Sequence, residues 1–73
     1  MDILEKRKFY RKHSEKINAL YDILKRLHLL KKEGFNNSQL EEVIKKMNLP
    51  LNAHLFITGY FGYLMEYMDS QKY

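Results

Sequence analysis

The chain has 73 residues, of which 45% are hydrophobic and 30% are charged, and its 13 Lys and Arg outnumber 9 Asp and Glu to give a net charge of +4. From this length we expect one small domain over residues 1–73. A core of this size contributes only ~3–5 kcal/mol of net stability. Because cysteine is absent, neither disulfides nor thiolate-bound metals can add to it. We therefore expect support from a second copy, as a homodimer.

The distribution of charge bears on where the protein works. The first sixteen residues carry nine charged side chains and lack the apolar run of a secretory signal, so we expect a cytoplasmic protein. The longest stretch without Asp, Glu, Lys or Arg, residues 47–65, contains Pro50, two asparagines and two glycines. Such a stretch argues against a membrane-spanning helix.

An amphipathic pattern begins at Ile3. The heptad-spaced positions are Ile3, Tyr10, Ile17 and Leu24, and His13, Leu20 and Leu27 fill the complementary positions. The pattern predicts one long helix over about residues 3–32, which Gly34 terminates. Such a helix would be ~45 Å long, whereas a domain of this size is only ~30 Å across. The helix must therefore bend near His13 and Ser14, or project toward a second copy.

Two further helices complete an all-α fold. Ser38 and Glu41 have the spacing of a capping box and predict a short helix over about residues 39–47. Asn48 then suits a left-handed turn, because asparagine tolerates that conformation. A third helix, over about residues 52–68, is apolar on nearly every side. It therefore needs more than one covering surface.

Basic residues are concentrated in the first half of the chain. Residues 1–34 hold ten basic and five acidic side chains, whereas residues 35–73 hold three basic and four acidic. An arc opposite the apolar stripe of the first helix is a candidate site for nucleic acid or another anionic partner. Its residues are Arg7, Lys8, Arg11 and Lys12, and Lys16 extends it. The alternative interpretation is a solvated helix face with local ion pairs such as Arg11–Glu15.

The third helix offers a candidate interface. Aromatic and methionine side chains dominate buried contact patches between proteins. The predicted dimer contacts are Phe56, Tyr60, Phe61, Leu64 and Met68. Gly59 and Gly62 each cost ~1 kcal/mol relative to alanine within a helix, so either close helix packing or a kink is expected there. The other interpretation of these residues is a core that belongs to one chain alone.

Several classes of function find no residues to support them. No cysteine and no i, i+4 pair of histidines is present, so we expect no metal site. His13 and His28 lie on or beside the apolar stripe, where a histidine is typically packed and hydrogen-bonded. No glycine-rich phosphate loop accompanies the few hydroxyl side chains, so we expect no enzyme, no cofactor and no small-molecule substrate.

These patterns favour a small non-catalytic regulator that binds an anionic partner, most simply nucleic acid, through its basic first helix. One competing hypothesis is a protein-interaction module that acts through its aromatic third helix. Such a module would be an inhibitor or adaptor of the kind a phage or other mobile element encodes. Residues 40–60 also have the loose spacing of a helix-turn-helix, but their second helix has no arginine or lysine to read bases. A peripheral membrane protein would need a bulkier apolar face beside residues 6–16.

Overall fold

In the computed structural model, which describes residues 3–71, the chain folds into six α-helices. Their bounds are α1 Ile3–Lys12, α2 Ser14–Ala19, α3 Tyr21–Lys32, α4 Asn37–Lys46, α5 Leu51–Gly59 and α6 Phe61–Asp69. The prediction of an all-α fold is confirmed. The prediction of three continuous helices is wrong, because the first is broken at His13 and Leu20 and the third at Tyr60.

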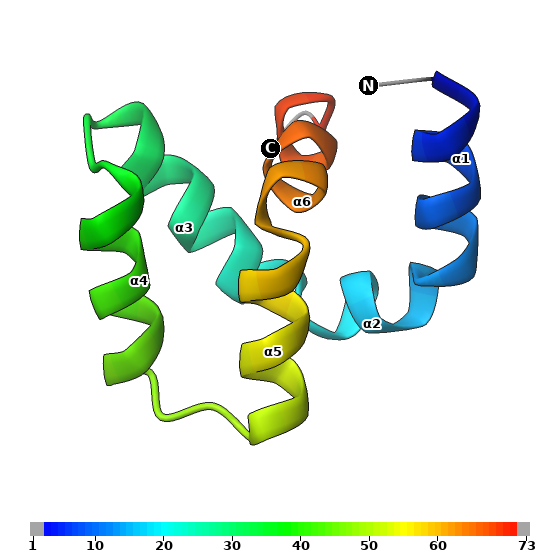
Figure 1. Cartoon of the computed structure of the whole chain (residues 1–73). Helices are drawn as coiled ribbons and strands as arrows, with labels where there is room; N and C mark the ends of the chain where they lie inside the picture. Colours follow the sequence, from blue (N-terminus) through cyan, green and yellow to red (C-terminus); the bar gives the residue numbers. More distant parts are fainter. Residues whose placement is uncertain (1–2, 72–73) are drawn as a thin grey trace.

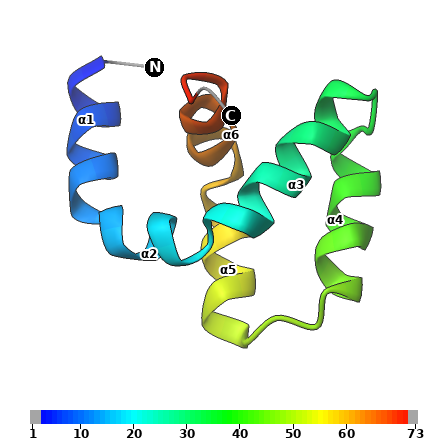
Figure 2. The same cartoon turned by 180° about the vertical axis from the view of Figure 1, so that it is seen from behind.

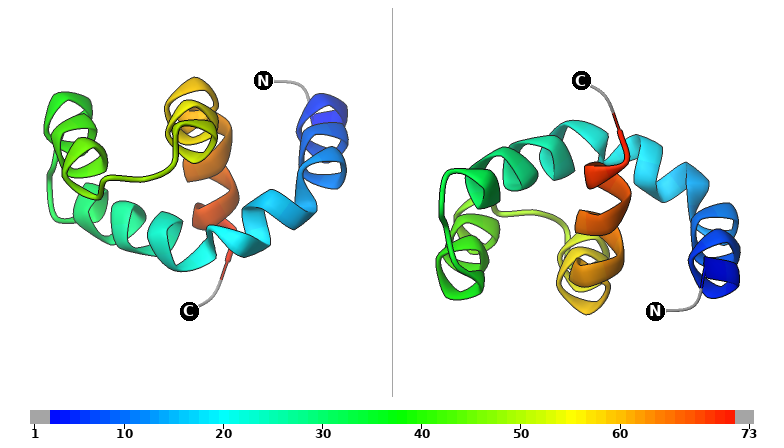
Figure 3. Two further views of the ribbon diagram at one scale, coloured as in Figure 1. Left: turned by 90° about the horizontal axis from the view of Figure 1, so that it is seen from below. Right: turned by 90° about the horizontal axis from the view of Figure 1, so that it is seen from above.

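The bends let the first half of the chain wrap around the last. The α5–α6 pair occupies the centre, with α3 and α4 on one side and α1 and α2 on the other (Figures 1 and 2). Seen end-on, α1 to α4 form a crescent, α5 lies between its two arms, and α6 runs from α5 toward the junction of α2 and α3 (Figure 3). The molecule measures 32 × 26 × 22 Å, which is too short for a straight helix over residues 3–32. Of the two expected outcomes, the bend at His13 is the one observed.

The bends leave the helical hydrogen bonds largely intact. His13 has φ −109° and ψ 18°, and Leu20 has φ −101° and ψ 9°. The backbone N–H of His13 still donates to the carbonyl of Phe9, and that of Leu20 donates to the carbonyl of Lys16. Each bend therefore costs little hydrogen bonding while it turns the apolar stripe back toward the central helices.

The core lies where the crescent meets α5 and α6. Each of its residues is at most 5% exposed: Ile17, Leu24, Leu27, Leu40, Ile44, Phe56, Ile57, Leu64, Met65 and Met68. Every helix except α1 contributes to this set. The apolar residues of α5 and α6 therefore pack against several other helices of the same chain.

The turn between α3 and α4 is set by local chemistry. Gly34, at φ 108°, ends α3 in a Schellman motif, in which the N–H of Phe35 donates to the carbonyl of Leu30. The capping box then lies at Asn36 and Gln39, two residues before the predicted Ser38 and Glu41. The earlier start is favoured because Phe35 and Leu40 then occupy the positions of a hydrophobic staple and both pack in the core.

The break at Tyr60 lies between Gly59 and Gly62, for which the sequence predicts either close helix packing or a kink. A Cβ added to Gly59 or Gly62 would meet nothing within 4 Å. Close packing inside this chain is therefore not the reason for either residue. A break of the helix is present at Tyr60, and close packing against a second copy stays a prediction. In the described part of the chain, no helix is both long enough and apolar enough to cross a bilayer.

Candidate functional site

The inner side of α1 is attached to α5 and α6 by aromatic rings. The Phe9 ring stacks on that of Tyr63, with centroids 4.7 Å apart, and runs parallel to that of Phe56 at 6.3 Å. Tyr10 contacts the Tyr67 ring at 5.0 Å, and its hydroxyl donates to the carbonyl of Tyr63 at 3.1 Å. Half-buried aromatic contacts, rather than fully buried core residues, hold this helix in place.

An ion pair also joins α1 to α6 on the inner side of α1. The ammonium of Lys6 lies 2.8 Å from a carboxylate oxygen of Glu66 on α6, and this hydrogen bond raises the pKa of Lys6. Lys6, Phe9 and Tyr10 follow the three- and four-residue spacing of a single helix face. Because this face is occupied by α5 and α6, the opposite face of α1 is held toward solvent.

The outward face of α1 carries the four basic residues that the sequence singles out. Arg7, Lys8, Arg11 and Lys12 are all exposed, and none of them forms an ion pair with another residue in 3–71. The expected Arg11–Glu15 pair is therefore not formed. Hereafter this set of four residues is called the basic arc. It presents four cations that no carboxylate of the described chain neutralises.

Lys16 does not extend the basic arc along a straight helix, because the bend at His13 intervenes. It lies on α2 with its ammonium 5.3 Å from the centroid of the Phe56 ring, at the distance of a cation–π contact. His13 lies between Lys16 and the arc, with its ring 5.2 Å from that of Phe56. Burial among these rings lowers the pKa of His13, and the charges of Lys12 and Lys16 lower it further.

The residues predicted to form a dimer interface are divided between core and surface. Phe56, Leu64 and Met68 are buried inside the single chain, and Phe61 is half-buried. Tyr60 is the one member that remains exposed, at 41%. Any contact of a second copy with this set would therefore have to rely on Tyr60 and the accessible part of Phe61.

Two leucines on α5 are exposed to solvent, which the sequence did not predict. Leu51 is 69% exposed and Leu55 57%, and they lie one helical turn apart. Their i, i+4 spacing was visible in the sequence. Their exposure was not, because the bend at Tyr60 decides which side of α5 faces the core.

His28 is the one buried polar residue in the described chain. Its Nε2 lies 2.5 Å from a carboxylate oxygen of Asp69, so the prediction of a packed, hydrogen-bonded histidine is confirmed for this residue. The hydrogen bond to His28 lowers the pKa of Asp69. This pair joins α3 to the end of α6, and the burial of the imidazole leaves it little access to solvent.

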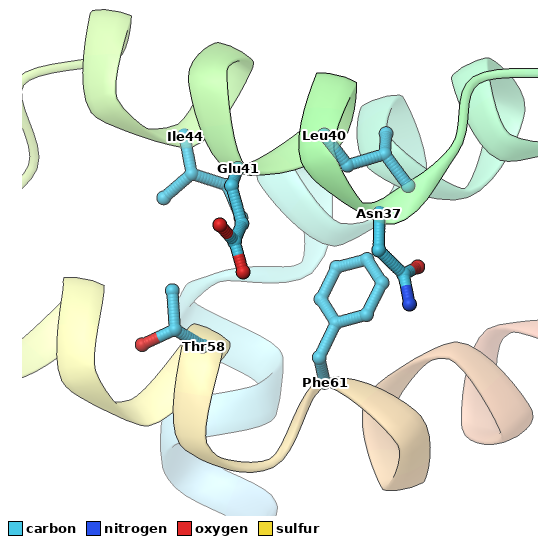
Figure 4. A pocket seen from close by; sticks show the side chains of 6 residues that line it. All are labelled: Asn37, Leu40, Glu41, Ile44, Thr58 and Phe61. Carbon is cyan, nitrogen blue, oxygen red and sulfur yellow. The ribbon is translucent and has the colours of Figure 1, made fainter.

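A hollow lies between α4 and the α5–α6 pair. Figure 4 shows the Phe61 ring pointing from α6 toward α4, and the Glu41 carboxylate pointing toward α5. Glu41 is its only titratable lining residue, and the nearby Thr58 hydroxyl donates to the carbonyl of His54 at 2.9 Å. This hollow therefore lacks a nucleophile paired with a base.

Within residues 3–71 no group of three His, Asp or Glu side chains could hold a metal ion.

No protein-family model, curated protein or solved structure matches this chain. The basis for a proposal of function is therefore the surface of the molecule itself.

Proposed function

We propose that the protein is a small, non-catalytic regulator that binds nucleic acid through the basic arc on α1. One observation carries the proposal. The aromatic and ionic docking of α1 occupies one face of the helix and leaves Arg7, Lys8, Arg11 and Lys12 exposed on the other, with no counter-charge from residues 3–71. Four unpaired cations on one face of a docked helix can contact the phosphates of a nucleic-acid backbone.

The mechanism is contact with phosphates rather than the reading of bases. Cations on one face of a helix neutralise phosphates whatever the sequence, and each released counterion makes binding weaker as salt increases. Four contacts predict that affinity for duplex DNA falls by about 100-fold between 50 and 200 mM salt. A homodimer would present two such arcs, and its existence stays a prediction.

Fluorescence anisotropy with a labelled random-sequence 20-bp duplex at 50, 100 and 200 mM salt tests the proposal. The variant Arg7→Glu/Arg11→Glu should bind at least tenfold more weakly at 50 mM salt and show a flatter salt dependence. Its matched control is Arg26→Glu/Lys46→Glu, which makes the same change in net charge at exposed positions on α3 and α4. The control should bind nearly as well as the unaltered protein. Equal losses in both variants would mean that net charge alone drives binding, and the basic arc would then have no special role.

A further inference from the structure

A shallow apolar groove runs along the surface between α2 and α5. Two adjoining hollows form it, and Lys16, Asn52 and Phe56 line both of them. Leu55 and Tyr60 border one hollow, and Leu20 and Ala53 border the other. Apolar side chains from two helices thus make a continuous lining along this side of α5.

Apolar side chains of α5 and of the bend after it are exposed in this groove or one helical turn from it. Leu55 and Tyr60 line it at 57% and 41% exposure, and Leu51 lies one turn before Leu55 at 69%. Two large aliphatic side chains and an aromatic ring are therefore in water on one short helix and its following bend. Isolated apolar residues on a surface are ordinary, but a cluster beside a groove is typical of a contact site.

The charge of the groove is of one sign. Lys16 and His13 are its only basic lining residues, and no Asp or Glu lines either hollow. The ammonium of Lys16 rests over the Phe56 ring and forms no ion pair with a residue in 3–71. A carboxylate on a bound partner would therefore find its opposite charge at the edge of an apolar surface.

We propose that this groove binds an acidic amphipathic segment of a partner protein, with apolar side chains against Leu55 and Tyr60 and a carboxylate against Lys16. Tyr60 and Lys16 could contact either class of partner. Leu20 and Leu55 favour a protein segment over nucleic acid, since aliphatic side chains offer neither a stacking surface for bases nor a charge for phosphates. The contact does not depend on the basic arc. The protein would then join a nucleic acid on one surface to a protein on another.

The test is a titration of the full-length ¹⁵N-labelled chain with two synthetic 16-residue peptides, followed by NMR. Both peptides carry leucines at positions i, i+4 and i+7 of a helix, and they differ only in having Glu or Lys at the flanking positions. The Glu peptide should bind at least tenfold more tightly than the Lys peptide. Its chemical-shift changes should fall on residues 13–20 and 50–60.

Variants assign the effect to individual side chains. Leu55→Ser should weaken binding of the Glu peptide at least tenfold, whereas the matched control Leu29→Ser, which alters an exposed leucine on α3, should leave it unchanged. Lys16→Glu should reverse the preference in favour of the Lys peptide. Arg7→Glu/Arg11→Glu should keep peptide binding even where it loses DNA, so failure of one proposal is distinguishable from failure of the other.

Equal affinity for the two peptides, or no binding of either peptide up to 1 mM, would overturn the proposal. Equal effects of Leu55→Ser and Leu29→Ser would also overturn it, as would shifts in the groove caused by the 20-bp duplex instead of the peptide. So would a dimer in light scattering that Leu55→Ser converts to monomer. The last result would assign the groove to a second copy of this chain. Melting curves of each variant confirm that it is folded before its binding is compared.

Discussion

Two residues hold left-handed backbone conformations at the ends of helices, and each can be tested singly. Gly34 has φ 108° and Asn48 has φ 54°. A side chain with a Cβ costs roughly 1–2 kcal/mol in this region, and asparagine is among the few that tolerate it. Both positions were predictable from sequence, because glycine and asparagine follow the last turns of their helices.

Asn48→Ala should therefore lower the free energy of unfolding by about 1 kcal/mol, while Asn48→Gly should be close to neutral. Urea denaturation of the three proteins measures both differences. If alanine and glycine behaved alike at this position, the left-handed conformation would not be the reason for asparagine.

The pair formed by His28 and Asp69 makes stability depend on pH. The hydrogen bond lowers the pKa of Asp69 in the folded state below its ordinary value of 3.8. The stability that this carboxylate contributes is therefore fully present above pH 3.8, and it is lost as pH falls through the pKa of the folded state. Asp69→Asn should thus be less stable than the unaltered protein by about 1 kcal/mol at pH 6, since a carboxylate that is 63% exposed contributes less than a buried charged hydrogen bond. The difference should shrink as pH falls below 3.8.

Urea denaturation from pH 6 to pH 2 measures this effect, with Asp22→Asn as the control at an exposed carboxylate. A difference between Asp69→Asn and the unaltered protein that stays constant down to pH 2 would contradict the linkage. The sequence placed His28 on an apolar stripe, but its partner lies 41 residues away and could not be predicted.

At the scale of elements, α1 is the helix held by the fewest buried contacts. It has no buried residue, and Phe9 is its main aromatic anchor against Phe56, Tyr60 and Tyr63. Phe9→Ala should cost about 2 kcal/mol, less than the ~3–5 kcal/mol of a fully buried phenylalanine, because the ring is only half-buried. Amide hydrogen exchange should accelerate in α1 while α3 and α6 stay protected.

Tyr10→Phe is the matched control for that prediction. It keeps the ring contact with Tyr67 and removes only the hydroxyl that donates to the carbonyl of Tyr63, at a cost of about 1 kcal/mol. If exchange in α1 were as fast in Tyr10→Phe as in Phe9→Ala, the hydrogen bond rather than the stacked rings would hold the helix.

Only some of the helix boundaries could be predicted from the sequence. Gly34 and Pro50 mark ends that local chemistry dictates, and the pattern of apolar residues placed the three helical regions. The break at Leu20 has neither glycine nor proline beside it, and the bend at His13 was offered only because a straight helix would be too long. These bends arise because α1 to α3 must follow the surface of α5 and α6, and that surface exists only in the folded molecule. The bend at His13 separates Lys16 from the basic arc. The bend at Tyr60 determines that Leu51 and Leu55 are exposed to solvent.

At the scale of the whole molecule, α1 to α4 pack against the apolar third region (Figure 3). Most of its large apolar side chains are thus buried within one chain, and association with a second copy stays a prediction. No buried side-chain nitrogen or oxygen in the described residues lacks a hydrogen-bond partner. The interior is therefore both apolar and satisfied within one chain.

Because the core closes within one chain, folding should not depend on association. The thermal midpoint should stay constant between about 5 and 500 μM protein, since an equilibrium that couples folding to dimerisation makes the midpoint depend on concentration. Circular dichroism at the helix minimum measures the midpoint, and light scattering at the same concentrations gives the mass. A dimer with a constant midpoint would mean that two folded chains associate through their surfaces. A midpoint that rises with concentration would show instead that the second copy stabilises the fold, and that the ten core residues of a single chain are not enough.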